Sequence, residues 1–163
     1  MANRRVEAGN MADLQAAFDQ WEASTRIIVP PGVYEGQLRV GKYSGTPVGH
    51  PPLEAEFEPG AILRGSPGSG LVLSVNWTKR LNATFYGDLL IEQAAMNGVF
   101  IGRSGVNWVE GTVTIDGCKL DGIKIVGTDP YDGRFLDGTW LDNVVVTRWG
   151  EAGLTTLELA WCR

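Results

Sequence analysis

Short runs of alternating apolar and polar residues occupy most of the chain after Arg26, and glycines separate these runs. Alternation with a period of two is the pattern of a half-buried β-strand. One stretch differs, because within residues 10–21 the apolar side chains follow helical spacing, at Leu14, Ala17, Phe18 and Trp21. The pattern therefore predicts one N-terminal helix, capped by Asn10 and with Asp13 in its first turn, followed by many short strands.

The alternating runs repeat in a common register. Four aliphatic residues each stand seven positions before a glycine, namely Leu63, Ile91, Ile115 and Val146. Each of these glycines is followed by another aliphatic residue, at Leu71, Val99, Ile123 and Leu154. Two further sets precede the first one: Ala61, Leu89, Val113 and Val144, and then Phe57, Phe85, Val109 and Trp140. The intervals between repeats are 28, 24 and 31 residues, and each repeat predicts three strands.

A single repeat of this kind cannot bury its apolar side, so neighbouring repeats must stack. A period of two excludes helical repeats, and the asparagine-bearing consensus of leucine-rich repeats is missing from the sequence. Parallel strands stacked as coils about 4.8 Å apart remain. We expect one all-β domain, a parallel β-helix of about four to five coils over residues 26–163, after an N-terminal arm and helix over residues 1–25.

The helix and the segment after it resemble the entry of a known fold family. Residues 26–34 read Arg-Ile-Ile-Val-Pro-Pro-Gly-Val-Tyr. This segment is similar to the start of right-handed parallel β-helix proteins of the pectate-lyase-like superfamily, which includes bacteriophage tailspikes. The resemblance implies that the helix caps the first coil and that the Pro-Pro-Gly turn opens the solenoid. It implies little about activity, because this fold carries lyases, hydrolases, epimerases and inert fibres.

Composition narrows the classes of function. Glycine makes up 22 of 163 residues, which suits many tight turns, and the net charge of −5 argues against a nucleic-acid partner. We find no apolar run long enough to insert into a membrane and no signal peptide, so we expect a chain made as a soluble cytoplasmic protein. Two cysteines are too few for a disulfide scaffold, and His50 is the single histidine.

The repeat register places two carboxylates next to each other on the outside. One position after the Leu63 set lie Arg64, Glu92, Asp116 and Thr147. Glu92 and Asp116 would be about 5 Å apart, a separation that suits a retaining glycosidase. They could instead share a calcium ion. The alternative is a solvated ladder in which Arg64 screens Glu92.

The longest insertion, residues 127–138, is the best candidate for a ligand-binding loop. Its three aspartates, Asp129, Asp132 and Asp137, could bind Ca²⁺, although no cofactor is otherwise expected. Tyr131 and Arg134 in the same loop are candidate carbohydrate contacts. Trp77 and Trp108, which we place on turns, are candidates for the same role. The alternative is a surface loop made of turn residues, with half-buried tryptophans.

The function we expect is structural or adhesive, that of a virion spike or fibre module. Residues 157–163 follow a strand without a capping helix, which predicts either a fragment of a longer β-helix or coverage by another chain. We therefore expect a homotrimer on a virion or outside the cell, in contact with polysaccharide or with other virion proteins. The alternative is a polysaccharide lyase or glycoside hydrolase represented by its N-terminal coils. The hydrolase segments Asn-Thr-Asp, Gly-His-Gly and Arg-Ile-Lys are missing from the sequence, which disfavours that alternative.

Overall fold

The computed structural model describes residues 2–7, 9–22, 24–41, 53–66, 70–126, 140–141, 143–150 and 154–157. Side chains are described for these residues except for 76–82, 103–104, 140–141 and 154–157. Within this part of the chain there is one helix, α1 (Met11–Asp19), and one sheet of 12 parallel strands. The first strands are β1 (Ala2–Arg5), β2 (Thr25–Val29), β3 (Gly32–Glu35), β4 (Leu38–Val40) and β5 (Leu53–Arg64). The others are β6 (Leu73–Ala94), β7 (Val99–Glu110), β8 (Val113–Cys118), β9 (Ile123–Val126), β10 (Trp140–Leu141), β11 (Val144–Trp149) and β12 (Leu154–Leu157).

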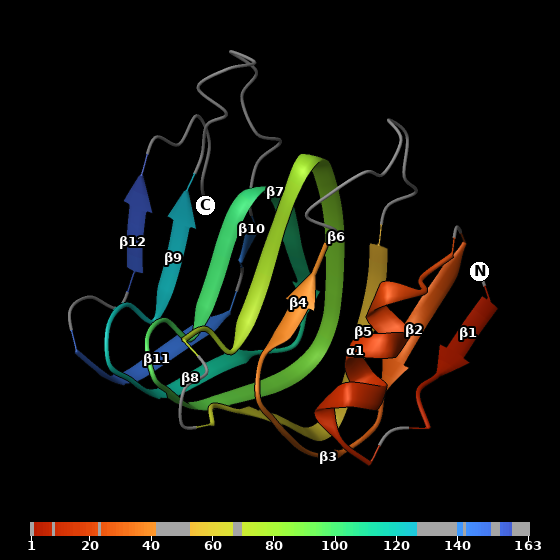
Figure 1. Ribbon diagram of the computed structural model, residues 1–163, viewed down its shortest axis with the longest axis horizontal. Coiled ribbons are helices and arrows are strands. Elements are labelled where there is room, and N and C mark those ends of the chain that lie inside the picture. Colours follow the sequence, from red (N-terminus) through yellow and green to blue (C-terminus); the bar gives the residue numbers. More distant parts are fainter. Residues whose placement is uncertain are drawn as a thin grey trace.

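The strands form three ladders, which we number in the order in which the chain visits them (Figure 1). Ladder one joins β1, β2, the first half of β5, the middle of β6, the second half of β7, and β10. Ladder two joins β3, the second half of β5, the end of β6, β8 and β11. Ladder three joins β4, the start of β6, the start of β7, β9 and β12. The predicted three strands per repeat are confirmed.

Together the ladders make a parallel β-solenoid of about three turns, which confirms the predicted all-β parallel β-helix with a helix. Short strands at the two ends extend the stack, so ladder two contains five strand segments. The predicted four to five coils therefore agree with the structure only when these end segments are counted.

Helix α1 lies against the first coil at the N-terminal end of the stack (Figure 1). Asn10 has an extended backbone, and its side-chain oxygen accepts a hydrogen bond from the Asp13 backbone N–H at 3.0 Å. The apolar stripe of the helix, Leu14, Ala17 and Phe18, is buried in the same core as the inward side chains of the strands. The predicted helix, its cap and its position over the first coil are confirmed.

The Pro-Pro-Gly corner connects β2 to β3 and is held by a buried tyrosine. Tyr34 is 1% exposed, and its hydroxyl donates to the Pro30 carbonyl at 2.9 Å. Tyr34 pairs with Leu63, whereas Val29 pairs with Phe57. The first coil thus contributes Tyr34 to the column of inward residues that contains Leu63, Ile91 and Ile115.

The inward residues of ladder two follow the predicted register. Leu63, Ile91, Ile115 and Val146 pair in succession, as do Ala61, Leu89, Val113 and Val144. All of them except the two valines of β11 are buried. The prediction from the glycine repeat is confirmed for this ladder.

The register predicted for ladder one is wrong by two residues between Phe57 and Phe85 and by one residue between Phe85 and Val109. Phe57 pairs with Gly87, whereas Phe85 pairs with Ala55 and with Trp108. The cause is the corner between ladders one and two, which has different lengths in successive coils and shifts the register at Phe57 and again at Phe85. Val109, predicted to be in the core, is 49% exposed at this shift.

An aromatic stack fills the core of ladder one. The Phe57 and Trp108 rings are parallel within 10°, with centroids 5.6 Å apart, and Phe85 packs at a tilt against both. The Trp108 indole N–H donates to the Gly87 carbonyl at 3.0 Å. These side chains are 4% exposed or less, so the stack joins three successive coils through their largest apolar side chains.

Ladder three also departs from the predicted register in one coil. Val99 and Ile101 pair with Ile123 and Ile125 as expected, but they pair with Leu73 and Val75 rather than with Leu71 and Leu73. The corner that precedes Leu73 is therefore two residues longer than the glycine spacing indicates.

Glycines are required at the corner between ladders one and two. Gly87 and Gly111 have φ angles of 83° and 90°, which favour glycine. A Cβ atom on Gly87 would lie 2.0 Å from the Phe57 carbonyl oxygen, and one on Gly111 would lie 2.3 Å from Gly87. The close stacking of successive corners therefore explains part of the high glycine content.

Candidate functional site

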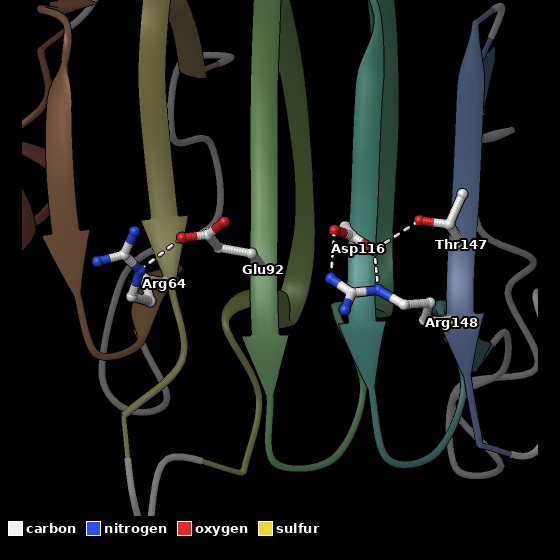
Figure 2. A network of polar contacts seen from close by, with 5 residues as sticks. All are labelled: Arg64, Glu92, Asp116, Thr147 and Arg148. Carbon is white, nitrogen blue, oxygen red and sulfur yellow. Dashed lines mark hydrogen bonds and ion pairs between the residues drawn. The ribbon is translucent and has the colours of Figure 1, made fainter.

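The outer face of ladder two carries a row of polar side chains that crosses every strand of the ladder. We call it the charged column; it consists of Glu35, Arg64, Glu92, Asp116 and Thr147. Each of these residues follows an inward residue by one position, buried in every coil except at Val146, so its side chain points away from the core. Figure 2 shows four of them, together with Arg148, on one face of neighbouring parallel strands. The predicted alignment of Arg64, Glu92, Asp116 and Thr147 is confirmed.

Arg64 and Glu92 form an ion pair between two coils. The Arg64 Nε atom donates to Glu92 Oε1 at 2.5 Å. The Glu92 side chain is 17% exposed and that of Arg64 is 37% exposed, so the carboxylate is the better shielded partner. The predicted alternative, in which Arg64 screens Glu92, is the arrangement that the structure contains.

Asp116 is held from the next coil by two side chains. Thr147 Oγ1 donates to Asp116 Oδ1 at 2.7 Å, and Arg148 donates to both carboxylate oxygens, at 2.6 and 2.5 Å. These hydrogen bonds, first that of Arg148 and then that of Thr147, lower the pKa of Asp116 from 3.8 to about 2. The same contact raises the pKa of Arg148 above its ordinary value.

An unusual backbone conformation brings Arg148 to Asp116. Its φ angle is 54°, in the left-handed region that residues other than glycine seldom adopt. Gln93 and Gly117 occupy the matching position in the two preceding coils, with φ angles of 57° and 79°. The left-handed conformation is therefore a repeated feature of the corner between ladders two and three. In the last described coil it returns the Arg148 side chain toward the outer face (Figure 2).

The contacts of Glu92 and Asp116 are those of structural ion pairs between coils and not those of a catalytic pair of carboxylates. Glu92 and Asp116 are register partners on adjacent strands, as predicted. A glycosidase needs one carboxylic acid that is protonated near neutral pH. Asp116, with its lowered pKa, is ionised there, and Glu92 is engaged by Arg64. An arginine that served as the base of a lyase would need a lowered pKa, whereas the pKa of Arg148 is raised. The catalytic role of Glu92 and Asp116 therefore stays a prediction, and their register pairing is the observation in its favour.

The candidate metal and loop residues lie mostly outside the described residues. Asp129, Asp132 and Asp137 fall there, as do Tyr131, Arg134 and His50. Among the residues that the structure describes, no group of three or more His, Cys, Asp or Glu side chains could hold a metal ion. The predicted calcium and sugar contacts of residues 127–138 stay predictions.

The two tryptophans proposed for carbohydrate binding lie in strands and not on turns. Trp108 is in β7, is 4% exposed, and stacks on Phe57 and Phe85. It therefore offers no free ring face to a sugar, and its assignment as a carbohydrate contact was wrong. Trp77 is in β6, and its side chain lies outside the described ones. The error at Trp108 has the same cause as the shifted register, because Val109 and not Trp108 was expected to point inward.

Asn97 and Asp121 act as turn residues. They are both 3% exposed, and the Asp121 backbone N–H donates to the Asn97 side-chain oxygen at 3.1 Å. Lys124 also lies 3.6 Å from an Asp121 carboxylate oxygen. Both residues lie in the corner between ladders two and three, where this hydrogen bond joins one coil to the next. Cys118 is buried, and that burial raises the pKa of its thiol, which disfavours the reactive thiolate form.

The outer face of ladder one has ion pairs that the sequence analysis did not identify. Arg26 donates to Glu54 and Glu56 of the next coil, at 3.2–3.3 Å, and its guanidinium lies 3.9 Å from the centroid of the Tyr86 ring one coil further on. Arg5 of β1 forms a two-pronged pair with Glu58 of β5. The alternation of Arg26, Glu54 and Glu56 with buried neighbours was the available signal, but it needed the correct register between coils.

A small cavity lies in the apolar interior of the described residues. It has a volume of about 10 Å³, lies between the later coils and is lined by apolar side chains, among them Phe85, Trp108 and Val144. This volume is at the lower limit for one water molecule, and its apolar walls would not hold that water. Within the described residues, no helix has the length and apolar character needed to cross a bilayer.

The described residues therefore form a solenoid in which outer polar side chains make ion pairs and hydrogen bonds between neighbouring coils. Comparisons with known proteins add no assignment: no protein-family model, no curated protein and no solved structure matches this chain.

Proposed function

We propose that this chain is a structural or adhesive β-solenoid module of the virion spike or fibre type, which works as an assembly of identical chains. The assembly expected from the sequence is a homotrimer, exposed on a virion or outside the cell. The observation that supports a structural role is the coil-to-coil pairing of the outer charges: Arg5, Arg26, Arg64 and Arg148 each bind a carboxylate of another coil.

These ion pairs hold neighbouring coils together and leave the paired carboxylates poorly suited to catalysis. An exposed ion pair contributes about 0–1 kcal/mol, so no single pair determines stability. Four arginines nevertheless bind carboxylates on strands of other coils, and together they favour one register between coils. If one strand slipped by one residue along its neighbour, these pairs would be separated. A rigid rod with fixed register is what a fibre or spike needs.

Contact with polysaccharide is the adhesive part of the proposal. It rests on the resemblance of residues 26–34 to β-helix proteins that include tailspikes, and on the loop 127–138 with Tyr131 and Arg134. Other virion proteins are the alternative partners. Cleavage of the polysaccharide by Glu92 and Asp116 is the second candidate function, and their register pairing is the single observation in its favour.

The test combines mass with a glycan panel. Light scattering behind size exclusion is expected to give a multiple of 17.7 kDa, and an array of acidic and neutral polysaccharides is expected to show binding without new reducing ends or unsaturated uronates. A monomer that releases such products, and that loses this activity in Glu92→Gln, would overturn the structural proposal in favour of the enzyme.

A further inference from the structure

A second row of side chains runs beside the charged column on the outer face of ladder two. We call it the aliphatic column; it consists of Val33, Ile62, Leu90, Thr114 and Val145. The two end residues, Val33 and Val145, are 43% and 47% exposed, and the three between them are partly buried. Four aliphatic side chains and one threonine thus form a row along the outside of the sheet, and exposed apolar side chains gathered in this way are a mark of a contact surface.

The charges beside this strip are self-complementary when the order of the coils is reversed. From the N-terminal coil onward the charged column reads negative at Glu35, positive at Arg64, and negative at Glu92 and Asp116, and then Arg148 adds a positive charge in the last coil. Reversal places Arg64 opposite Asp116 and Glu35 opposite Arg148. Glu92 is at the centre of the column and would face its own copy.

The aliphatic column has the same centre. Reversal places Val33 opposite Val145 and Ile62 opposite Thr114, with Leu90 facing itself. With Arg148 counted in place of Thr147, the charged column matches its reversed copy apart from the central glutamates, and the aliphatic column matches its own apart from the contact of Ile62 with Thr114. Each Glu92 already has the Arg64 of its own chain at 2.5 Å, so the two central carboxylates would lie between two arginines.

We propose that this face binds a second copy of the chain in antiparallel orientation, about a twofold axis that passes beside Leu90 parallel to the strands. The inference rests on the self-association in the proposed function and specifies a contact between two chains within it. A twofold contact of this kind closes with two chains. A trimer would therefore need a different face.

The antiparallel arrangement also places unlike ends together. Val145 of β11 would pack on Val33 of the partner, which lies in the coil covered by α1.

Five strands about 4.8 Å apart, each about 17 Å long, give a face of roughly 350 Å² per chain. The total buried area of about 700 Å² is below the usual 1,200–2,000 Å² of stable complexes. We therefore expect a reversible, concentration-dependent dimer.

The first experiment is sedimentation equilibrium of the full chain over a wide concentration range. The unsubstituted chain is expected to approach two chains, and Leu90→Lys is expected to weaken association at least tenfold. Thr84→Lys is the matched control, because Thr84 is a partly exposed outward residue of β6 in ladder one of the same coil. A monomer at all concentrations, or equal weakening by both substitutions, would overturn the inference.

Disulfide trapping then tests the orientation, in a Cys118→Ala, Cys162→Ser background. Mixed Val33→Cys and Val145→Cys chains are expected to form the 33–145 bridge, and Leu90→Cys is expected to bridge to itself. Bridges between like residues at 33 and at 145, without the mixed one, would show parallel packing and overturn the antiparallel pair. A trimer unaffected by all these substitutions would overturn this inference while leaving the proposed self-association intact.

Discussion

The two ends of the solenoid are built differently. At the N-terminal end, Leu14 and Phe18 of α1 are at most 1% exposed, and β1 presents the exposed residues Arg4 and Arg5 at its edge. At the other end, β11 pairs with β8, and no other described strand pairs with it. There Val145 and Trp149 are 47% and 49% exposed.

The same column shows the difference most directly. Tyr34, Leu63, Ile91 and Ile115 occupy one inward column and are 1% exposed or less, whereas Val146, the next residue of that column, is only partly buried. An inward side chain is therefore fully buried only where a structural element packs on each side of its coil along the stack. Among the described residues, the N-terminal end has that second neighbour in α1, and β11 has none.

The largest expected effect concerns this contrast in the core. Phe18→Ala should lower the free energy of unfolding by about 3–5 kcal/mol, because it leaves a cavity under the helix. Val146→Ala should cost about 1 kcal/mol or less, because its site is already partly open. Chemical denaturation of both variants measures the difference, and similar losses would show that the C-terminal coil is as well packed as the N-terminal one.

Removing a buried hydrogen bond near the N-terminal end should likewise lower the free energy of unfolding more than removing an exposed one in β11, although both losses should be smaller than that of Phe18→Ala. Tyr34→Phe removes the buried hydrogen bond to Pro30 and should cost about 1 kcal/mol. Thr147→Val removes an exposed hydrogen bond to Asp116 and should change stability by less than about 0.5 kcal/mol. A larger loss at Thr147 would contradict the assignment of the tighter end to the N-terminus.

The left-handed corner allows a comparison within one column. Gln93→Gly should stabilise the protein by up to about 1 kcal/mol, because glycine adopts a φ of 57° without strain. Arg148→Gly should gain less, since it also removes the ion pair with Asp116. Thermal melting measures both changes, and a destabilised Gln93→Gly protein would mean that the side chain of Gln93 has a role of its own.

The smallest effect is a titration. The pKa of Asp116 in the folded chain is about 2, below its ordinary value of 3.8, so the contribution of this pair is present above about pH 4 and is lost as the pH falls toward 2. Carboxyl-carbon NMR should find this low pKa in the unsubstituted protein. Arg148→Gln should move it back toward 3.8, and an unchanged value would mean that Arg148 does not hold the carboxylate in solution.

The sequence predicts correctly the part of the fold in which glycine spacing and strand pairing agree. Leu63, Ile91 and Ile115 each stand seven residues before a glycine, and the structure pairs them in that order although the intervals between them are 28 and 24 residues. The aromatic residues of ladder one lie across corners of unequal length. Simple spacing therefore assigned Val109 to the core in place of Trp108.

The site shows the same limit. The adjacency of Glu92 and Asp116 follows from the register, but the partner of Asp116 does not. Arg148 is one position beyond the charged column and reaches Asp116 only because of its left-handed backbone, which residue identity alone does not indicate. Alternation likewise marks the outward residues of ladder two, but the complementarity of the two columns emerges only after all five strands are aligned.

Peptide-resolved hydrogen exchange at low and high protein concentration tests two claims together: that the two ends of the solenoid differ in packing, and that a second copy of the chain covers β11. The amides of β2 and β5 are expected to exchange slowly at both concentrations. Those of β11 are expected to exchange much faster in dilute solution and to gain protection when a second copy packs on Val145. Equal protection of β11 and β2 in dilute solution, with no dependence on concentration, would contradict the account.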